Sequence, residues 1–260
     1  MLDDDQLLRY HRQILLPEWD IAGQEKLSAA TVLVVGMGGL GCPLAQYLAA
    51  AGAGRLILAD FDTVEVTNLQ RQVLHHEADV GRLKVESAAA KLRALNGGVR
   101  VEVLAEVVDD ALLARWLPEV DVVADCCDNF ATRERVAAAA WRAGVPLVSG
   151  AAIGWQGQLA VFDPRARESA CYHCLYPPGG DDEAPTCSEN GVMATTVAVI
   201  EPWKVLALSV PPLPEKVLPE LAPRLSLSVR VALANGKAVT PPLTSELRST
   251  VDDEACLAVT

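Results

Sequence analysis

The chain has 260 residues, of which 51% are hydrophobic, so it is long enough to bury a large core. Its formal net charge of -12 argues against nucleic acid as the main partner, because phosphate binding requires a basic surface. The sequence contains no apolar run of the length that a membrane-spanning helix needs, and the acidic start at residues 1–5 has no apolar segment of a signal peptide. We therefore expect a cytoplasmic protein with neither nucleic acid nor a membrane as its partner.

Hydrophobic periodicity predicts that strands and helices alternate over the first 150 residues. Strands are expected at 31–35, 55–60, 99–103, 121–125, 146–149 and 158–162. Helices are expected at 3–16, 40–51, 82–95, 109–116 and 131–143. This alternation predicts an α/β fold with a Rossmann-like, doubly wound, mostly parallel sheet.

The last third of the chain departs from this alternation. Residues 163–190 are polar, rich in Pro, Gly and Asp, and contain three cysteines, which predicts a long crossover loop. Residues 210–223 contain five prolines, which exclude a continuous helix. Alternating apolar residues followed by Asn235-Gly236 predict a hairpin over 224–240, which would form a C-terminal antiparallel extension.

A glycine-rich segment lies between the first predicted strand and the following helix. The segment matches the pattern G-x-G-x-x-G, which is typical of dinucleotide-binding loops, with glycines at Gly36, Gly38, Gly39 and Gly41. Glycines let the backbone turn tightly and approach a phosphate, and a helix N-terminus attracts negative charge. Asp60 ends the next strand, where its carboxylate can accept hydrogen bonds from ribose hydroxyls. The loop predicts nucleotide binding but does not by itself separate NAD from ATP.

A polar cluster follows the second predicted strand and favours ATP. Asn68, Arg71 and Gln72 would share one helical face, because residues three and four apart are neighbours on a helix. Lys84, after Gly81, is placed to neutralise phosphate charge that develops during a transfer reaction. A plain dehydrogenase needs none of these groups, so the cluster indicates a triphosphate.

Asp128 follows the strand predicted to end at Asp125. It is therefore expected at the carboxyl edge of the sheet, where open α/β folds bind their ligands. A carboxylate beside phosphates suits Mg²⁺, which prefers oxygen ligands. The alternative for Asp128 is that it caps the next helix.

Taken together, these segments resemble the MoeB/ThiF/HesA family, the bacterial relatives of ubiquitin-activating enzymes. The matching motifs are Arg9-Tyr-His-Arg12-Gln-Ile-Leu15, Gly36 to Gly41, Asp60-Phe-Asp62-Thr-Val, Asn68-Leu-Gln-Arg71-Gln72, Gly81-Arg-Leu-Lys84-Val-Glu, Cys127-Asp128-Asn129 and Pro146-Leu-Val-Ser-Gly-Ala-Ala152. The resemblance covers residues 1 to about 209 and is closest to the MoeB branch, which contains molybdopterin-synthase adenylyltransferases.

The resemblance implies a role for each matching residue. Asp60 would bind the ribose, and Asn68, Arg71 and Lys84 would bind phosphates and stabilise charge. The remaining residues implied at the nucleotide are Asp62, Gln72, Asn129 and the four glycines of the loop. Asp128 would hold Mg²⁺, and Arg12 would contact the γ-phosphate across a homodimer interface, unless it is only a surface arginine.

The implied activity is that of an ATP-dependent adenylyltransferase. The substrate would be the C-terminal glycine carboxylate of a ubiquitin-like sulfur-carrier protein ending in Gly-Gly, and the products an acyl-adenylate and pyrophosphate. The pathway would be molybdopterin or thiamin biosynthesis. On this interpretation residues 1–209 form the ATP-binding adenylyltransferase domain, and residues 210–260 form a divergent C-terminal segment.

The cysteines leave two questions open. Cys171 and Cys174 form a C-x-x-C motif, half of the four-thiolate zinc site that the family often has, but the second pair is missing and only Cys256 lies in the tail. Bound Zn²⁺ and two free thiols both remain possible. Cys187 matches the family's reactive-loop cysteine, which carries a covalent link to the carrier in some relatives and is dispensable in others.

Two further functions remain as alternatives. An NAD-dependent oxidoreductase would share the glycine loop and Asp60, but it would leave Arg12, Arg71 and Lys84 unexplained. A degenerate, non-catalytic homologue would account for the divergent tail, although the intact nucleotide motifs argue against it.

Overall fold

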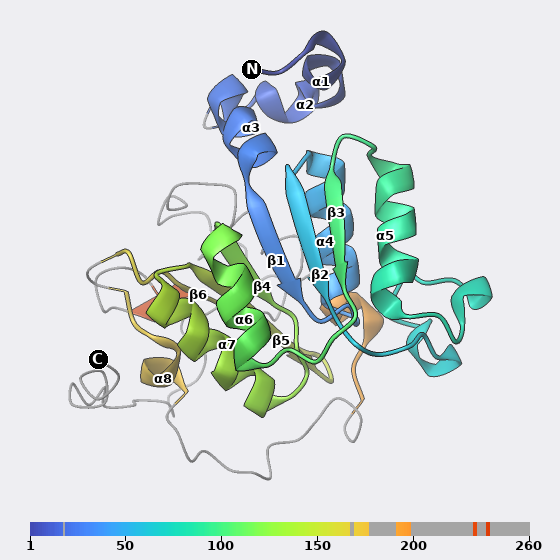
Figure 1. Ribbon diagram of the computed structural model, residues 1–260, viewed down its shortest axis with the longest axis vertical. Coiled ribbons are helices and arrows are strands. Elements are labelled where there is room, and N and C mark those ends of the chain that lie inside the picture. The colour runs from blue at the N-terminus through green and yellow to red at the C-terminus, as the bar shows by residue number, and fades with distance from the viewer. Residues whose placement is uncertain (18, 167–168, 177–190, 199–230, 233–237, 240–260) are drawn as a thin grey trace.

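The computed structural model describes residues 1–17, 19–166, 169–176, 191–198, 231–232 and 238–239. Six strands form one sheet in the order β3-β2-β1-β4-β5-β6 (Figure 1). They are β1 (Thr31–Val35), β2 (Arg55–Ala59), β3 (Arg100–Leu104), β4 (Val122–Asp125), β5 (Leu147–Ile153) and β6 (Gln156–Phe162). Neighbouring strands are parallel throughout, except that β6 runs antiparallel to β5. The sheet confirms the predicted doubly wound, mostly parallel α/β fold.

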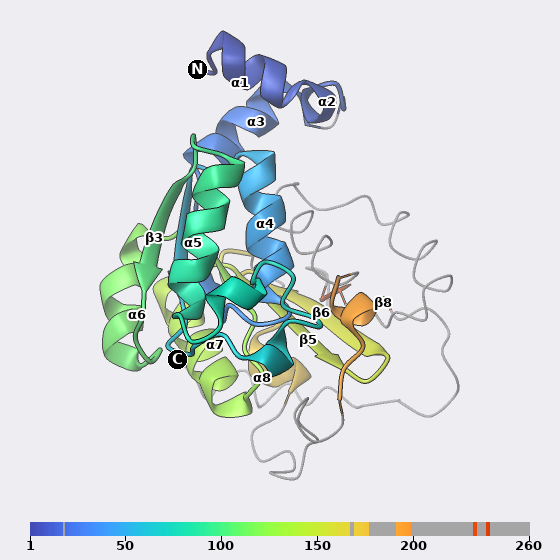
Figure 2. The ribbon, with the colours of Figure 1, turned by 90° about the vertical axis from the view of Figure 1, so that its right-hand side faces the viewer.

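Helices cover both faces of the sheet. The α-helices are α1 (Asp4–Arg9), α2 (His11–Ile14), α3 (Asp20–Ala29), α4 (Gly41–Ala51), α5 (Lys84–Leu95), α6 (Asp110–Trp116), α7 (Phe130–Ala143) and α8 (Tyr172–Leu175). Short 3-10 helices are η1 (Val66–Asn68), η2 (Glu77–Asp79) and η3 (Leu117–Glu119). Figure 2 shows α4 and α5 on one side of the sheet and α6 and α7 on the other. Among the helices that the structure describes, none combines the length and the apolar character that a membrane crossing requires.

The core consists of two apolar layers, one on each face of the sheet. Side chains alternate between the two faces along a strand, and β1 shows this directly. Val32 and Val34 pack with α4 and α5, whereas Leu33 and Val35 pack with α6 and α7. Because both faces are covered, the central strands are buried on both sides, which explains their continuous apolar sequences.

The N-terminal segment differs from the single helix predicted at 3–16. Tyr10 ends α1 with non-helical backbone angles, and its buried ring packs against Gly52, which has a φ of 90°. Its hydroxyl accepts a hydrogen bond of 2.9 Å from Asn96 Nδ2. The helix is therefore broken because Tyr10 turns into the core, a long-range contact that apolar spacing does not reveal.

Three other features differ from the sequence analysis. Helix α3 was not predicted, because its buried positions are Gln24 and Leu27 and give no apolar period. Helix α8 lies inside the predicted loop 163–190, whose residues 177–190 are outside the described residues. Within the predicted hairpin 224–240, Val231–Ala232 (β7) and Ala238–Val239 (β8) pair antiparallel, and the rest is not described. The division of the chain at residue 209 stays a prediction.

Candidate functional site

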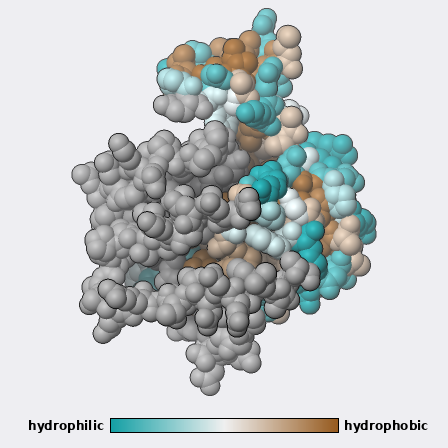
Figure 3. Space-filling view, turned by 90° about the vertical axis from the view of Figure 1, so that its left-hand side faces the viewer, coloured by the Kyte–Doolittle hydropathy of each residue, from teal (hydrophilic) through white to brown (hydrophobic). Residues whose placement is uncertain are grey.

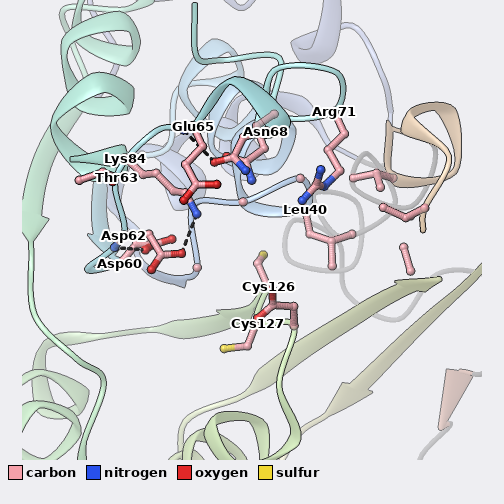
Figure 4. A pocket seen from close by; sticks show the side chains of 18 residues that line it. Leu40, Asp60, Asp62, Thr63, Glu65, Asn68, Arg71, Lys84, Cys126 and Cys127 are labelled. Carbon is pink, nitrogen blue, oxygen red and sulfur yellow. Dashed lines mark hydrogen bonds and ion pairs between the residues drawn. The ribbon is translucent and has the colours of Figure 1, made fainter. Parts of the chain in front are cut away.

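A pocket of about 290 Å³ lies where the strand order reverses, at the carboxyl ends of β1, β2 and β4. Loops leave β1 and β4 in opposite directions there, and α/β folds of this kind bind ligands at such a switch point. The described residues that line the pocket are Gly36, Gly38, Gly39, Leu40, Asp60, Asp62, Thr63, Glu65, Asn68, Arg71, Gln72, Lys84, Cys126, Cys127, Asp128, Ala152, Val192 and Val197 (Figure 4). The pocket therefore brings together ten of the predicted site residues.

The glycine loop leads from β1 into α4. Gly36 has a φ of 93°, which other residues rarely adopt. A Cβ on Gly41 would lie 1.8 Å from the carbonyl oxygen of Gly36, so this glycine permits close packing of the helix against the loop. A Cβ on Gly38 would meet nothing closer than 3.6 Å, and Gly38 lines the pocket. Gly36 and Gly41 thus shape the loop, whereas Gly38 leaves open space for a ligand.

Asp60 holds the loop in place from the end of β2. One carboxylate oxygen accepts a hydrogen bond of 2.6 Å from the backbone N–H of Met37, and the other accepts one of 2.8 Å from the N–H of Asp62. Burial raises the pKa of Asp60, and these two N–H groups partly oppose that shift. An ionised carboxylate has about four acceptor positions, so the bonds that it makes leave positions for ribose hydroxyls.

The segment after β2 carries the polar cluster. Backbone N–H groups of Arg71 and Gln72 both bond to the carbonyl of Asn68, which gives the expected helical turn. The Arg71 side chain packs over Gly39 and donates a hydrogen bond of 3.2 Å to the Thr67 carbonyl. Lys84 is buried at the start of α5, and its Nζ lies 2.7 Å from Asp62 Oδ2. In Figure 4, Lys84 and Asp62 lie at one side of the pocket and Arg71 lies at the other.

Gln72 is buried in the pocket wall beside Gly38. Its carbonyl oxygen has no hydrogen-bond partner among the residues that the structure describes. A buried acceptor without a partner costs free energy, so a donor on a bound ligand would relieve this cost.

The end of β4 contributes Cys126, Cys127 and Asp128. Both cysteines are buried, and burial is the main cause that raises the pKa of Cys127, which favours the protonated thiol. Asp128 is exposed and lines the pocket, so its carboxylate is accessible to a ligand. It does not cap α7, because the cap is Asn129, whose Oδ1 accepts 2.9 Å from Thr132 N. Neither Asn129 nor Gly41 lines the pocket.

The charges of the pocket are unbalanced. Its described lining holds two cations, Arg71 and Lys84. It also holds four carboxylates, those of Asp60, Asp62, Glu65 and Asp128. A triphosphate would therefore meet a net negative lining, and its binding calls for further positive charge from a metal ion or from another chain.

The structure does not bring the remaining predicted residues into the pocket. Arg12 is exposed on α2, which lies with α1 and α3 at the opposite, amino-terminal edge of the sheet (Figure 1). Cys171 is the N-cap of α8 and Cys174 lies within that helix, and their Sγ atoms are 3.0 Å apart. Cys187 and Cys256 are outside the described residues.

Several lining residues were missed by the sequence analysis. Thr63 and Glu65 follow β2 directly, and Cys126 and Cys127 follow β4, so their position at strand ends was a usable signal. Val192 and Val197 come from a segment beyond the crossover loop, and Gly154 pairs with Val192 to hold that segment near β5. No local pattern reveals such a contact.

Comparison with known proteins places this geometry in a family. The ThiF family model matches residues 10–206. The molybdopterin-synthase adenylyltransferase of Escherichia coli (strain K12) is 50% identical over 199 residues, which cover 76% of this chain and 79% of that protein. The adenylyltransferase and sulfurtransferase MOCS3 of Sus scrofa is 48% identical over 200 residues, and these cover 76% of this chain but only 44% of MOCS3.

A solved structure has a similar fold. The crystal structure of E. coli MccB with ATP superimposes with a TM-score of 0.61 and 26% identity, covering 72% of this chain and 57% of MccB. The family motifs, the sheet order and the relatives therefore agree. This chain belongs to the ThiF family.

Proposed function

We propose that this protein is an ATP-dependent adenylyltransferase that activates the C-terminal carboxylate of a ubiquitin-like sulfur-carrier protein. The observation that carries the proposal is that a single pocket holds the glycine loop, Arg71, Lys84 and Asp128 together. The relatives are named adenylyltransferases, and the neighbour MccB has been crystallised with ATP, which supports the same chemistry here.

The reaction requires positioning more than acid–base chemistry. The carrier's terminal carboxylate attacks the α-phosphorus of ATP, a new O–P bond forms, and the bond from that phosphorus to the bridging oxygen breaks to release pyrophosphate. The attacking group is already ionised, so no general base is needed. Asp60 orients the ribose, while Lys84, Arg71 and Asn68 stabilise charge on the phosphates.

Magnesium fits the donors that the pocket offers. Asp128 and Asp62 are carboxylates with exposed side chains, and Mg²⁺ is usually held by one or two carboxylates together with substrate phosphates and water. Within the described part of the chain, no group of three or more His, Cys, Asp or Glu side chains could hold a metal ion. The site thus suits a metal that arrives with ATP, and the metal would supply positive charge to the phosphates. Asp128 would hold it.

Zinc fits less well. A structural zinc site needs four ligands, and the described residues bring together the sulfur atoms of Cys171 and Cys174. We therefore propose ATP and Mg²⁺ as the cofactors and leave zinc out. A covalent role for Cys187 and the cytoplasmic location stay predictions.

A homodimer would supply the missing positive charge. Within one chain, Arg12 lies at the edge of the sheet opposite to the pocket, so it would reach a nucleotide only on a second subunit. The helices that carry it expose apolar side chains, with Leu8 78% exposed and Leu15 61% exposed. Figure 3 shows hydrophobic surface on the N-terminal helices, as expected of a surface that a second copy covers.

Among the pathways, we favour molybdopterin biosynthesis over thiamin biosynthesis. The relatives described above are named for molybdopterin synthase or as MOCS3, and the MoeB-like motifs of this chain agree with that. The partner would be a small sulfur-carrier protein ending in Gly-Gly.

Exchange of labelled pyrophosphate into ATP tests the proposal directly. We expect exchange only when a carrier ending in Gly-Gly is added, and none when the terminal glycine is deleted from the carrier. ATP binding without exchange for any such carrier would indicate a non-catalytic homologue. Hydride transfer from a nicotinamide cofactor, without exchange, would instead favour the oxidoreductase alternative.

A further inference from the structure

A buried ion pair lies directly behind the loop that carries Asp128. Asp125, the last residue of β4, is 0% exposed, and Arg133 on α7 is 8% exposed. Arg133 Nη1 lies 3.1 Å from Asp125 Oδ2, and the Ser149 hydroxyl donates a hydrogen bond of 2.6 Å to the same oxygen. None of these three residues lines the pocket.

The other hydrogen bonds of this pair hold the backbone of one residue from both sides. Asp125 Oδ1 accepts a hydrogen bond of 3.0 Å from the backbone N–H of Cys127. Arg133 Nη2 donates to the carbonyl of Cys127 and, at 2.8 Å, to the carbonyl of Gly150 in β5. Both backbone polar groups of the residue before Asp128 are therefore fixed.

The residue after Asp128 is also fixed. Asn129 caps α7 through Thr132, which ties it to the helix that bears Arg133. Asp128 thus lies between two anchored neighbours, and its own side chain remains exposed in the pocket. This arrangement limits where the Asp128 carboxylate can be.

Stability alone is a weak reason for such a pair. Burying two charges costs solvation free energy, and apolar residues of similar size often serve stability equally well. Attraction to Arg133 and the hydroxyl of Ser149 nevertheless keep the pKa of Asp125 below its usual value, so the carboxylate is ionised and can hold both donors. The forked shape of the guanidinium matters because it reaches two carbonyls and a carboxylate at once.

We infer that Asp125 and Arg133 are positioning residues that hold the Asp128 carboxylate where it binds metal-complexed ATP. The inference rests on the proposed function, since it takes Asp128 as the ligand of the metal. It requires no direct contact between Arg133 and the nucleotide.

The central variant is Arg133→Lys. It keeps the charge beside Asp125 but lacks the fork that also reaches Cys127 and Gly150. Affinity for ATP should fall about tenfold or more with Mg²⁺ present, the loss typical when a group that orients a metal ligand is removed. Affinity in EDTA should stay within about twofold, because the glycine loop and Lys84 are untouched. Calorimetric titration with ATP measures both values, and thermal melting checks the fold.

Arg135→Lys on the same helix is the matched control, because Arg135 donates to Val108 and not to the Asp128 loop. It should change neither affinity. If Arg133→Lys does not fold, Ser149→Ala removes one of the hydrogen bonds to Asp125 and should produce a smaller loss of the same kind. Equal losses with Mg²⁺ and with EDTA would overturn the inference, because they would indicate a general structural role.

A double variant separates this inference from the proposed function. If Arg133 acts through Asp128, then Arg133→Lys combined with Asp128→Asn should bind ATP with Mg²⁺ no more weakly than Asp128→Asn alone. Additive losses would overturn the inference. A wild-type protein that binds no ATP at all would instead contradict the proposed function itself.

Discussion

The ammonium group of Lys84 lies 2.7 Å from the carboxylate of Asp62, and the two side chains differ sharply in exposure, 9% for Lys84 and 51% for Asp62. The lysine is thus buried in the pocket wall and held by an ion pair, while its partner is largely exposed to solvent. Because a buried cation is little hydrated, it can stabilise developing phosphate charge without reorganising its surroundings.

Replacement of Lys84 should therefore reduce the rate more than binding. We expect Lys84→Met to lower carrier-dependent pyrophosphate exchange about 100-fold to 1,000-fold, as removal of one preorganised charge-stabilising group typically does. Lys26→Met, at an exposed lysine of α3, is the control and should leave the rate unchanged. A rate near wild type in Lys84→Met would remove Lys84 from the reaction.

Two glycines of the loop should respond differently to alanine. Gly41→Ala places a Cβ 1.8 Å from the Gly36 carbonyl and should destabilise the protein by roughly 3 kcal/mol. Gly38→Ala meets no atom within 3.4 Å, so the fold should survive, while ATP affinity falls about tenfold because the new methyl group occupies space meant for a phosphate. Urea unfolding and ATP titration measure the two effects. Unchanged ATP affinity in Gly38→Ala would show that no phosphate approaches this residue.

Mixed dimers should reveal whether Arg12 acts on the other subunit. Arg12→Ala and Asp128→Ala are each expected to abolish exchange, the first through lost charge and the second through lost metal binding. When the two variants are mixed and allowed to exchange subunits, each mixed dimer gains one intact site, so about one quarter of wild-type activity should return. No recovery in verified mixed dimers would mean that Arg12 acts within its own subunit or lies outside the site.

A buried histidine should make stability depend on pH. His75 Nδ1 lies 2.9 Å from the Ser87 hydroxyl, and Nε2 lies 3.3 Å from the Met37 carbonyl. A carbonyl oxygen only accepts, so Nε2 donates there, and the neutral ring then accepts from the Ser87 hydroxyl at Nδ1. Burial lowers the pKa of His75, and the positive charge of Lys91 lowers it further.

The direction in which stability changes with pH follows from the lowered pKa of His75. The unfolded chain takes up a proton near the ordinary histidine pKa of 6.5, whereas the folded protein does so at lower pH. The contribution of His75 is therefore fully present above pH of about 6.5 and is lost as the pH falls toward the folded pKa. Urea unfolding between pH 7.5 and 5.0 should show a shallower decline for His75→Gln than for wild type. His76→Gln, at the neighbouring exposed histidine, should behave as wild type does.

Local sequence patterns were sufficient to predict the central sheet, the family and the enzyme class. The buried strands have continuous apolar sequences because helices cover both faces, and Gly36 to Gly41 with Asp60 identify the nucleotide end of the sheet. The predicted ThiF-type family membership and adenylyltransferase class are confirmed by the family match and the relatives. The Asp128 carboxylate also lies where its place after β4 predicts.

What the sequence concealed depends on contacts between distant segments. The break at Tyr10 has no local signature, because its hydroxyl bonds to Asn96, which lies 86 residues further along the chain. Asp125 and Arg133 are only 8 residues apart, but their hydrogen bonds are completed by Ser149 and Gly150 of another strand. Val197 lines the pocket only because the segment around it returns to the end of β5. Such contacts follow from the folded sheet rather than from the periodicity of any one segment.

The anchoring of Tyr10 has a further consequence. Its ring packs against Gly52, and its hydroxyl accepts a hydrogen bond from Asn96. Arg12 follows only two residues later, so its position depends on how this segment packs on the core of its own subunit. In a dimer of the proposed kind, any shift of one subunit's framework would move the arginine that serves its neighbour. The two reaction centres would then be mechanically coupled, and a substitution at Gly52 would disturb catalysis in the opposite subunit.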